Sequence, residues 1–294
     1  IFSGWSLKDC LHYFKNNADG SYSDLSLKTG LSNIKGGLNM IQADYNNDGH
    51  LDIFLLRGAW KGKFGSIPNS LIRNNGDGTF SDVTISSGLL SFHPTQTAVW
   101  RDFNNDGWID LFIGNESNIN NSDLHPCELY MSNRNGTFTN IAAKAGVHVI
   151  DYVKGVTAGD FNNDGWSDIF ISAMSGKHYL LQNEGSKNES LQFKDVTQKA
   201  GLDSAIGGTF TTWFWDYDND GWLDIFTCDY EFSRPLSDYA AKEILHLQRP
   251  GDNTGKPYLF RNNHDGTFTN IAPGTGLFTT TFSMGGNFGD LNND

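Results

Sequence analysis

The sequence predicts an all-β fold, a β-propeller of four-stranded antiparallel blades, with about five repeats in its 294 residues. Three observations lead to this prediction. An acidic loop motif recurs along the chain, a turn motif rich in Asn and Gly accompanies it, and the segments between the motifs are short apolar runs of strand length. Four short strands in each repeat of roughly 58 residues are typical of propeller blades.

The acidic motif reads Asp-x-Asn/Asp-x-Asp-Gly-x-x-Asp, and its copies begin 58, 58, 56 and 74 residues apart. The copies span residues 44–52, 102–110, 160–168, 216–224 and, in part, 290–294. The longer last spacing contains an insertion over residues 229–257. Within it, residues 238–247 have a helical pattern, with Ser237 as the N-cap.

The turn motif is clearest at residues 75–84, where Asn-Gly-Asp-Gly-Thr-Phe leads into Ser-Asp-Val-Thr. It returns at residues 135–141 and 263–271, with weaker copies at 18–25 and 192–197, and a Gly-Leu or Gly-Val follows each copy. Asn-Gly and Asp-Gly between apolar runs predict tight β-hairpins. In the first full repeat we therefore expect strands at residues 38–43, 53–56, 71–73 and 80–84.

Oxygen-bearing side chains alternate along each acidic loop, as in loops that bind Ca²⁺, which takes six to eight oxygen ligands. Glycine at the sixth position permits a sharp turn. We expect four complete Ca²⁺ sites and a fifth partial one. The expected side-chain ligands are Asp44, Asn46, Asp48 and Asp52; Asp102, Asn104, Asp106 and Asp110; Asp160, Asn162, Asp164 and Asp168; Asp216, Asp218, Asp220 and Asp224; and Asp290, Asn292 and Asp294. The backbone carbonyls of His50, Trp108, Trp166 and Trp222 would complete the four sets.

Other metals fit these loops less well. An EF-hand has Glu at its twelfth position and helices on both sides, whereas these loops end in Asp at position nine and run directly into apolar strands. Zinc prefers His and Cys side chains, and magnesium keeps several waters rather than entering an all-protein cage. Turn formation alone by Asp, Asn and Gly is the alternative, but it does not account for the ninth-position Asp in all four complete copies.

The net charge of −13 comes almost entirely from these loops. Without their 15 Asp carboxylates it would be +2. An acidic chain disfavours nucleic acid as a partner. No apolar run is long enough for a membrane-spanning helix. The three cysteines do not form a disulfide framework.

The loops, together with Phe288-Gly289-Asp290, resemble FG-GAP/VCBS repeats, the calcium-binding blades of integrin α propellers. The combination with Asn-Gly-Asp-Gly-Thr-Phe and Ala-Gly-Leu is similar to the cartilage acidic protein and ASPIC/UnbV group. This resemblance covers essentially the whole chain and implies a seven-bladed propeller, an extracellular setting and a binding or adhesion role. Residues 1–294 would then be a single propeller domain or a fragment of one. The five repeats and the missing trailing domain depart from the group's pattern.

Loops after the second and fourth strands of each blade would lie on the face away from the acidic loops. They vary most, and function concentrates in such loops. The candidate ligand-contacting residues on that face are Trp60, His125, Arg234 and Tyr239. The recurring Trp108, Trp166 and Trp222 could form an aromatic platform for carbohydrate or pack against the neighbouring blade.

Three functions remain open from the sequence. The first is a secreted or cell-surface scaffold that binds protein or carbohydrate. The second is a self-assembling subunit of a surface layer or filament, and the third is a polysaccharide-acting hydrolase or lyase. No Ser/His/Asp or Cys/His order indicates catalysis, and the acidic clusters are explained by metal. Glycosylation sequons begin at Asn115, Asn120, Asn135 and Asn188.

Overall fold

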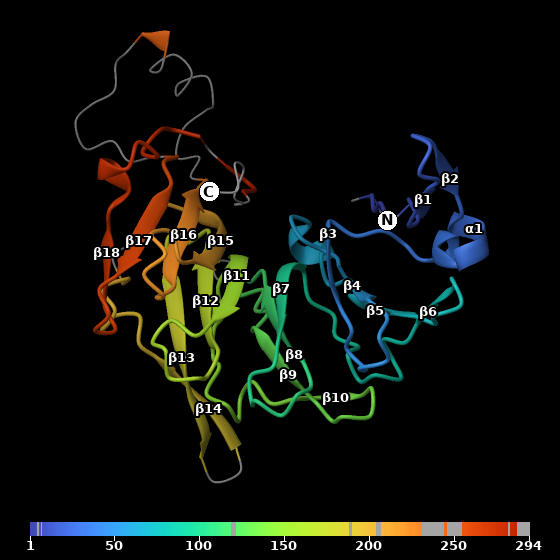
Figure 1. Ribbon diagram of the computed structural model, residues 1–294, viewed down its shortest axis with the longest axis horizontal. Helices are drawn as coiled ribbons and strands as arrows, with labels where there is room; N and C mark the ends of the chain where they lie inside the picture. The colour runs from blue at the N-terminus through green and yellow to red at the C-terminus, as the bar shows by residue number, and fades with distance from the viewer. Residues whose placement is uncertain are drawn as a thin grey trace. The chain divides into compact units, whose positions relative to one another are not determined.

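The computed structural model describes residues 1–4, 6, 8–118, 122–187, 190–203, 207–230, 244–245, 255–281 and 283–286 (Figure 1). The chain divides into two compact units. The first comprises residues 1–153 and 183–194, and the second comprises residues 154–182 and 195–294. The two units are described separately below.

The described residues form one two-stranded and four four-stranded sheets, as the repeats predict. Neighbouring strands are antiparallel wherever their register is described. The small sheet holds β1 (Phe14–Asn16) and β2 (Tyr22–Asp24). The next two sheets are β3 (Asn39–Ala43), β4 (Asp52–Leu56), β5 (Ser70–Asn74) and β6 (Phe80–Asp82), then β7 (Thr95–Arg101), β8 (Asp110–Asn115), β9 (Glu128–Ser132) and β10 (Phe138–Asn140). The last two are β11 (Val153–Gly159), β12 (Asp168–Ala173), β13 (His178–Lys187) and β14 (Ser190–Asp195), then β15 (Thr209–Trp215), β16 (Asp224–Asp229), β17 (Tyr258–Asn262) and β18 (Phe268–Asn270).

Helical structure is limited to short turns among the described residues. These are α1 (Ser26–Thr29) and the 3-10 turns η1 (Leu31–Asn33), η2 (Gly62–Phe64) and η4 (Ala272–Gly274). The helix expected at residues 238–247 lies largely outside the described residues. The strands expected in the first full repeat are present, with ends shifted by one or two residues.

In the first unit, β4 is buried on both faces because it lies in the middle of its sheet and other layers cover both sides. Ile53 and Leu55 belong to one apolar cluster together with Leu11 and Leu31. Phe54 and Leu56 alternate with them and belong to a second cluster that includes residues of β7 to β10. This explains why the strand reads as a continuous apolar run rather than as an alternating one.

The second unit has its own core between two sheets. Phe170 of β12 and Phe214 of β15 lie in one buried cluster, with ring centroids 6.4 Å apart. Ile225 of β16 and Phe260 of β17 belong to the same cluster. Trp213 and Trp215 lie on β15, the first strand of its sheet.

In three of the Gly-Leu or Gly-Val pairs the Gly lies close to another backbone segment: Gly30, Gly88 and Gly146. Gly146 has a φ of +79°, and a Cβ there would lie 2.9 Å from the carbonyl oxygen of Phe193. Beside it, the N–H of Phe193 donates a 2.8 Å hydrogen bond to the carbonyl of Ala145. The same bond joins Phe138 to Ser87 and Phe268 to Ala200. The repeat therefore keeps Gly where one backbone passes close to the outer strand of the next sheet.

Candidate metal centre

Each of the four complete acidic loops joins the first strand of a four-stranded sheet to the second. Residues 44–52 connect β3 to β4, and the loops beginning at Asp102, Asp160 and Asp216 occupy the same place in the other three sheets. The last Asp of each loop is also the first residue of the second strand. The loops are therefore fixed at both ends by sheet hydrogen bonding.

Two positions in every loop have left-handed backbone. The fourth residue has φ between +55° and +57° and is always Asn: Asn47, Asn105, Asn163 and Asn219. The sixth residue has φ between +84° and +88° and is always Gly: Gly49, Gly107, Gly165 and Gly221. Asn and Gly are the residues that adopt this conformation most readily. The composition of the motif thus follows from its backbone as well as from its oxygen atoms.

The first Asp of each loop closes the turn. In the second loop, Asp102 accepts hydrogen bonds from the N–H of Asp106 at 3.1 Å and from the N–H of Gly107 at 2.8 Å. Equivalent bonds of 2.8–3.0 Å form at Asp44, Asp160 and Asp216. These bonds hold the carboxylate over the loop and leave lone pairs on its oxygens for a cation.

The ninth Asp is buried, with 0–1% of its surface exposed in all four loops. Oδ2 of Asp110 accepts the N–H of Phe103 at 3.0 Å, and Oδ1 accepts the N–H of Ser132, at the end of β9, at 2.8 Å. Asp52 and Asp224 make the same two kinds of contact. The ninth Asp therefore ties its loop to the third strand of the same sheet.

Burial also affects the charge of these carboxyls. It raises the pKa of Asp52 to about 6 and that of Asp110 to about 7, against the opposing effect of the backbone N–H donors. Burial likewise raises the pKa of Asp224. The nearby Asp side chains of the same loops add to this effect. A cation beside the carboxyls would favour their charged form.

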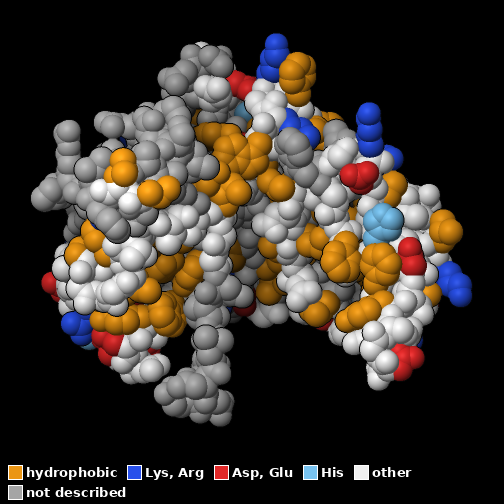
Figure 2. All heavy atoms as spheres, turned by 90° about the horizontal axis from the view of Figure 1, so that it is seen from above, with side chains coloured by type: hydrophobic (Ala, Val, Ile, Leu, Met, Phe, Trp, Pro, Cys, Tyr) orange, Lys and Arg blue, Asp and Glu red, His pale blue; other side chains and the backbone are white. Residues whose placement is uncertain are grey.

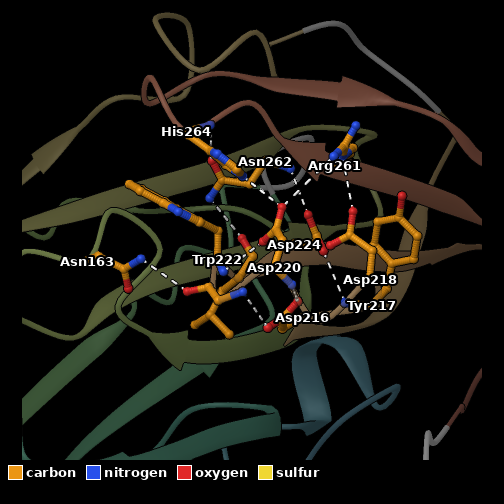
Figure 3. A network of polar contacts seen from close by, with 12 residues as sticks. Asn163, Asp216, Tyr217, Asp218, Asp220, Trp222, Asp224, Arg261, Asn262 and His264 are labelled. Atoms are coloured by element: carbon orange, nitrogen blue, oxygen red, sulfur yellow. Dashed lines mark hydrogen bonds and ion pairs between the residues drawn. The ribbon is translucent and has the colours of Figure 1, made fainter.

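The fourth loop brings three carboxylates together (Figure 3). Oxygens of Asp216, Asp218 and Asp224 lie within 4.8 Å of one another, and this is the one such group among the described residues. Asp216 and Asp218 are the first and third loop residues, and Asp224 is the ninth. This spacing allows all three to reach a single ion.

Basic side chains contact two of the loops from elsewhere in the same sheet. Arg134 lies 2.8 Å from Oδ2 of Asp106. In the fourth loop, Arg261 lies 3.3 Å from Asp218, and Nε2 of His264 lies 2.8 Å from Asp220 (Figure 3). Arg134 and His264 occupy the same place in their turns, each with positive φ. These contacts offset part of the negative charge and compete with a metal for the carboxylates.

The donor set suits a hard cation. Each complete loop offers carboxylate and amide oxygens, with the left-handed fourth and sixth residues folding them back over the turn. The ligand set contains no sulfur or imidazole side chain. Oxygen-only sets of this charge favour Ca²⁺ over the transition metals.

The family model for the FG-GAP-like repeat matches three overlapping stretches, residues 62–113, 102–171 and 160–227, which together cover more than half of the chain. The chain belongs to the FG-GAP-like repeat family. Each matched stretch contains one or two of the acidic loops described above.

Cartilage acidic protein 1 of Xenopus tropicalis is 28% identical over 247 residues, which are 80% of this chain and 36% of that protein. The proteins of the same name from Mus musculus and Homo sapiens are each 26% identical over 230 residues. This chain spans about a third of the length of these relatives. Among the described residues, no helix is both long and apolar enough to cross a membrane.

The candidate ligand-contacting residues of this FG-GAP-like chain differ in their exposure. Trp60 is 38% exposed, and its backbone N–H donates to Oε2 of Glu116 at 2.8 Å. His125 is 7% exposed, so little of its side chain is open to a large protein or carbohydrate partner. Arg234, Tyr239 and the partial loop with Asp290, Asn292 and Asp294 lie outside the described residues.

Two sequence interpretations change. Trp222 stacks on His264 in a turn of its own sheet, with ring centroids 4.8 Å apart, which the sequence did not suggest. Asn115 is fully buried and donates to the carbonyl of Pro126, so the first sequon offers no site for a glycan. Asn135 is exposed, and Asn120 and Asn188 lie outside the described residues.

Sequence reasoning missed the basic residues that reach the loops, because Arg134, Arg261 and His264 are distant from them along the chain. It also missed His93, whose Nδ1 lies 2.8 Å from Nδ1 of His125. These contacts form only when strand pairing brings the ends of the strands together, so no local sequence pattern indicates them.

Proposed function

We propose that the four complete loops each bind one Ca²⁺, with the side-chain ligands and the four backbone carbonyls given in the sequence analysis. The ninth Asp carries this proposal. It is buried, it accepts two backbone N–H groups, and in the fourth loop it lies beside two further carboxylates. Burying a carboxylate without a compensating positive charge is costly, and Ca²⁺ would provide that charge.

Bound Ca²⁺ would stabilise the sheets rather than react. Each loop connects the first two strands of a sheet, and its ninth Asp also holds the third. An ion would therefore join three of the four strands at one end. Without an ion, the Asp carboxylates within each loop would repel one another.

We further propose that the chain is part of an extracellular propeller that acts as a binding scaffold, with protein or carbohydrate as its partner. Extracellular modules with weak sites keep Ca²⁺ bound because external calcium is high. The similarity to cartilage acidic protein 1 supports placing the chain in this class. We treat residues 1–294 as one propeller domain or a piece of a larger one, and a seven-bladed ring remains a prediction.

The partner would meet the face away from the acidic loops. Trp60 lies there, 38% exposed, with its ring 5.9 Å from that of Tyr152 in an edge-on arrangement. Phe64, Phe92 and Leu124, from loops on the same side, are also exposed. On the face drawn in Figure 2, hydrophobic side chains are exposed between uncharged ones, and charged side chains are scattered singly or in small groups.

Calcium titration calorimetry tests the metal proposal, with four sites expected from the complete loops and Mg²⁺ as the competing ion. Glycan and protein arrays, probed with wild-type protein and with Trp60→Ala in saturating Ca²⁺, test the scaffold proposal. Loss of a specific signal in Trp60→Ala supports it. An unchanged signal would show that Trp60 does not contact the partner. Catalytic turnover of a polysaccharide would show that the chain is an enzyme rather than a binding scaffold.

A further inference from the structure

Two histidines meet at the end of the second sheet that lies opposite its acidic loop. His93 is two residues before β7, and His125 is three residues before β9. Because β8 is antiparallel to both of these strands, β7 and β9 run in the same direction. The starts of β7 and β9 therefore lie at the same end of the sheet. The acidic loop at residues 102–110 lies at the opposite end.

The two imidazoles face each other through the same ring atom. Their Nδ1 atoms are 2.8 Å apart, and the ring planes are inclined by 71°. The other nitrogen of His125, Nε2, lies 3.0 Å from Oδ1 of Asp123. When Nε2 carries the proton and donates to Asp123, Nδ1 of His125 is unprotonated and its lone pair is available.

Buried side chains fix the backbone around the pair. Asn115 is fully buried, accepts a 2.7 Å hydrogen bond from the hydroxyl of Thr95, and donates at 2.8 Å to the carbonyl of Pro126. Thr95 and Pro126 are close neighbours of the two histidines in the chain. The N–H of His125 also donates to the hydroxyl of Ser117 at 2.8 Å. The pair is therefore held in place by the sheet and not by a loose loop.

We propose that His93 and His125 form a site for a late first-row transition metal with square or octahedral coordination, such as Cu²⁺ or Ni²⁺. Their two Nδ1 atoms are the protein ligands, and Asp123 orients His125. Two nitrogens bound at about 2.0–2.1 Å and at right angles to one another are about 2.9 Å apart. The observed separation is 2.8 Å. A carboxylate on the far nitrogen of a ligating imidazole is the usual outer partner in such sites.

The blade repeat does not require this pair. The residues two positions before the first strands of the other three four-stranded sheets are Gly37, Asp151 and Gly207. The histidines thus add something to the second sheet beyond its fold. Imidazole nitrogen favours the later transition metals over Ca²⁺, so this site differs in chemistry from the acidic loops, and it does not depend on their proposed function.

A simple Nδ1–H···Nδ1 hydrogen bond is the competing explanation of the contact. It requires a proton between the two nitrogens, whereas metal binding requires both lone pairs. Binding would move the proton of His93 from Nδ1 to Nε2, where solvent can accept its hydrogen bond, and would leave the charge of both rings unchanged. Only the metal explanation predicts a site that either histidine substitution removes.

The experiment titrates the protein with Cu²⁺, the strongest binder of the divalent series, at pH 7.5 in saturating Ca²⁺. Calorimetry gives the affinity, and electron paramagnetic resonance counts the ligating nitrogens. The variants are His93→Gln, His125→Gln and Asp123→Asn. His12→Gln is the matched control, since His12 is exposed and belongs to the same unit of the chain.

We expect one site with two nitrogen ligands in the wild type and in His12→Gln, and loss of that site in His93→Gln and His125→Gln. Asp123→Asn should bind about 10–100-fold more weakly. Unchanged Cu²⁺ binding in His93→Gln, or equal loss in His12→Gln, would overturn the proposal. Calcium stoichiometry and thermal melting check the fold of each variant. If the buried His125→Gln fails to fold, His93→Gln and Asp123→Asn decide the question.

Discussion

The backbone N–H of Ser132 donates a 2.8 Å hydrogen bond to Oδ1 of Asp110, which links the end of β9 to the last residue of the acidic loop that precedes β8. Oδ2 of the same carboxyl accepts the N–H of Phe103 at 3.0 Å. One buried side chain therefore joins a loop, the strand that it begins and the strand beside it. Substitution of this residue tests the loop and the sheet together.

Asp110→Asn should remove one Ca²⁺ from the calorimetric stoichiometry. The substitution removes the negative charge of a metal ligand. The amide NH₂ also replaces a carboxylate oxygen that accepts a backbone N–H in the wild type. Leaving a buried donor without its acceptor costs about 1–3 kcal/mol, so the free energy of unfolding should also fall. Asp203→Asn is the control, because Asp203 is exposed and lies outside the loops. Full calcium stoichiometry in Asp110→Asn would contradict the proposed site.

Chelation should destabilise the whole chain. Each independent site at about 100-fold over its dissociation constant adds about 2.7 kcal/mol to the free energy of unfolding. Thermal melting in excess chelator is therefore expected at a clearly lower temperature, with recovery on adding Ca²⁺ and little recovery on adding Mg²⁺. Identical melting curves with and without chelator would show that the loops hold their shape without metal.

Gly146→Ala should lower the free energy of unfolding by more than the positive φ alone explains. An alanine in left-handed backbone costs about 1–2 kcal/mol, and its Cβ would lie 2.9 Å from the carbonyl oxygen of Phe193. Gly276→Ala is matched in φ, +76° against +79°, but its Cβ would have no atom within 4 Å. Urea unfolding should show a further loss of about 1–3 kcal/mol in Gly146→Ala, because the close contact must relax. Equal losses would mean that the contact is easily accommodated.

His178 predicts an acid-sensitive core in the second unit. It is 4% exposed, lies between the rings of Phe170 and Phe260, and neither ring nitrogen has a hydrogen-bond partner among the described residues. Burial lowers its pKa to about 4. The unfolded chain, with a histidine pKa of about 6.5, therefore binds a proton first as the pH falls. Stability is lost between about pH 6.5 and pH 4, by about 2 kcal/mol at pH 5.

His178→Phe removes this titration and should lose less stability than the wild type between pH 7.5 and pH 5. Urea unfolding at both values in saturating Ca²⁺ measures the difference. His148→Gln, which replaces an exposed histidine, should behave like the wild type. An equal loss in wild type and His178→Phe would mean that other groups account for the acid sensitivity.

The sequence predicted the scaffold well because its signals are local. The Asn and Gly of each loop mark left-handed backbone, and the turn at residues 75–79 closes through a 3.0 Å bond between Asn75 N–H and the Thr79 carbonyl. Strand order followed from the repeat. The stack of Trp222 on His264 was not foreseeable, because it depends on how a turn 42 residues later folds back.

The sequence by itself determined the all-β repeat, the family and the place of the acidic loops, since each depends on residues that are neighbours in the chain. The tertiary structure decided what surrounds those loops: which N–H groups hold Asp110, which basic side chains reach Asp106 and Asp220, and that His93 meets His125. Apart from Phe103, which is seven residues from Asp110, those partners come from strands and turns 20 to 45 residues away. Only the pairing of strands in a sheet sets such distances, and no local pattern records them.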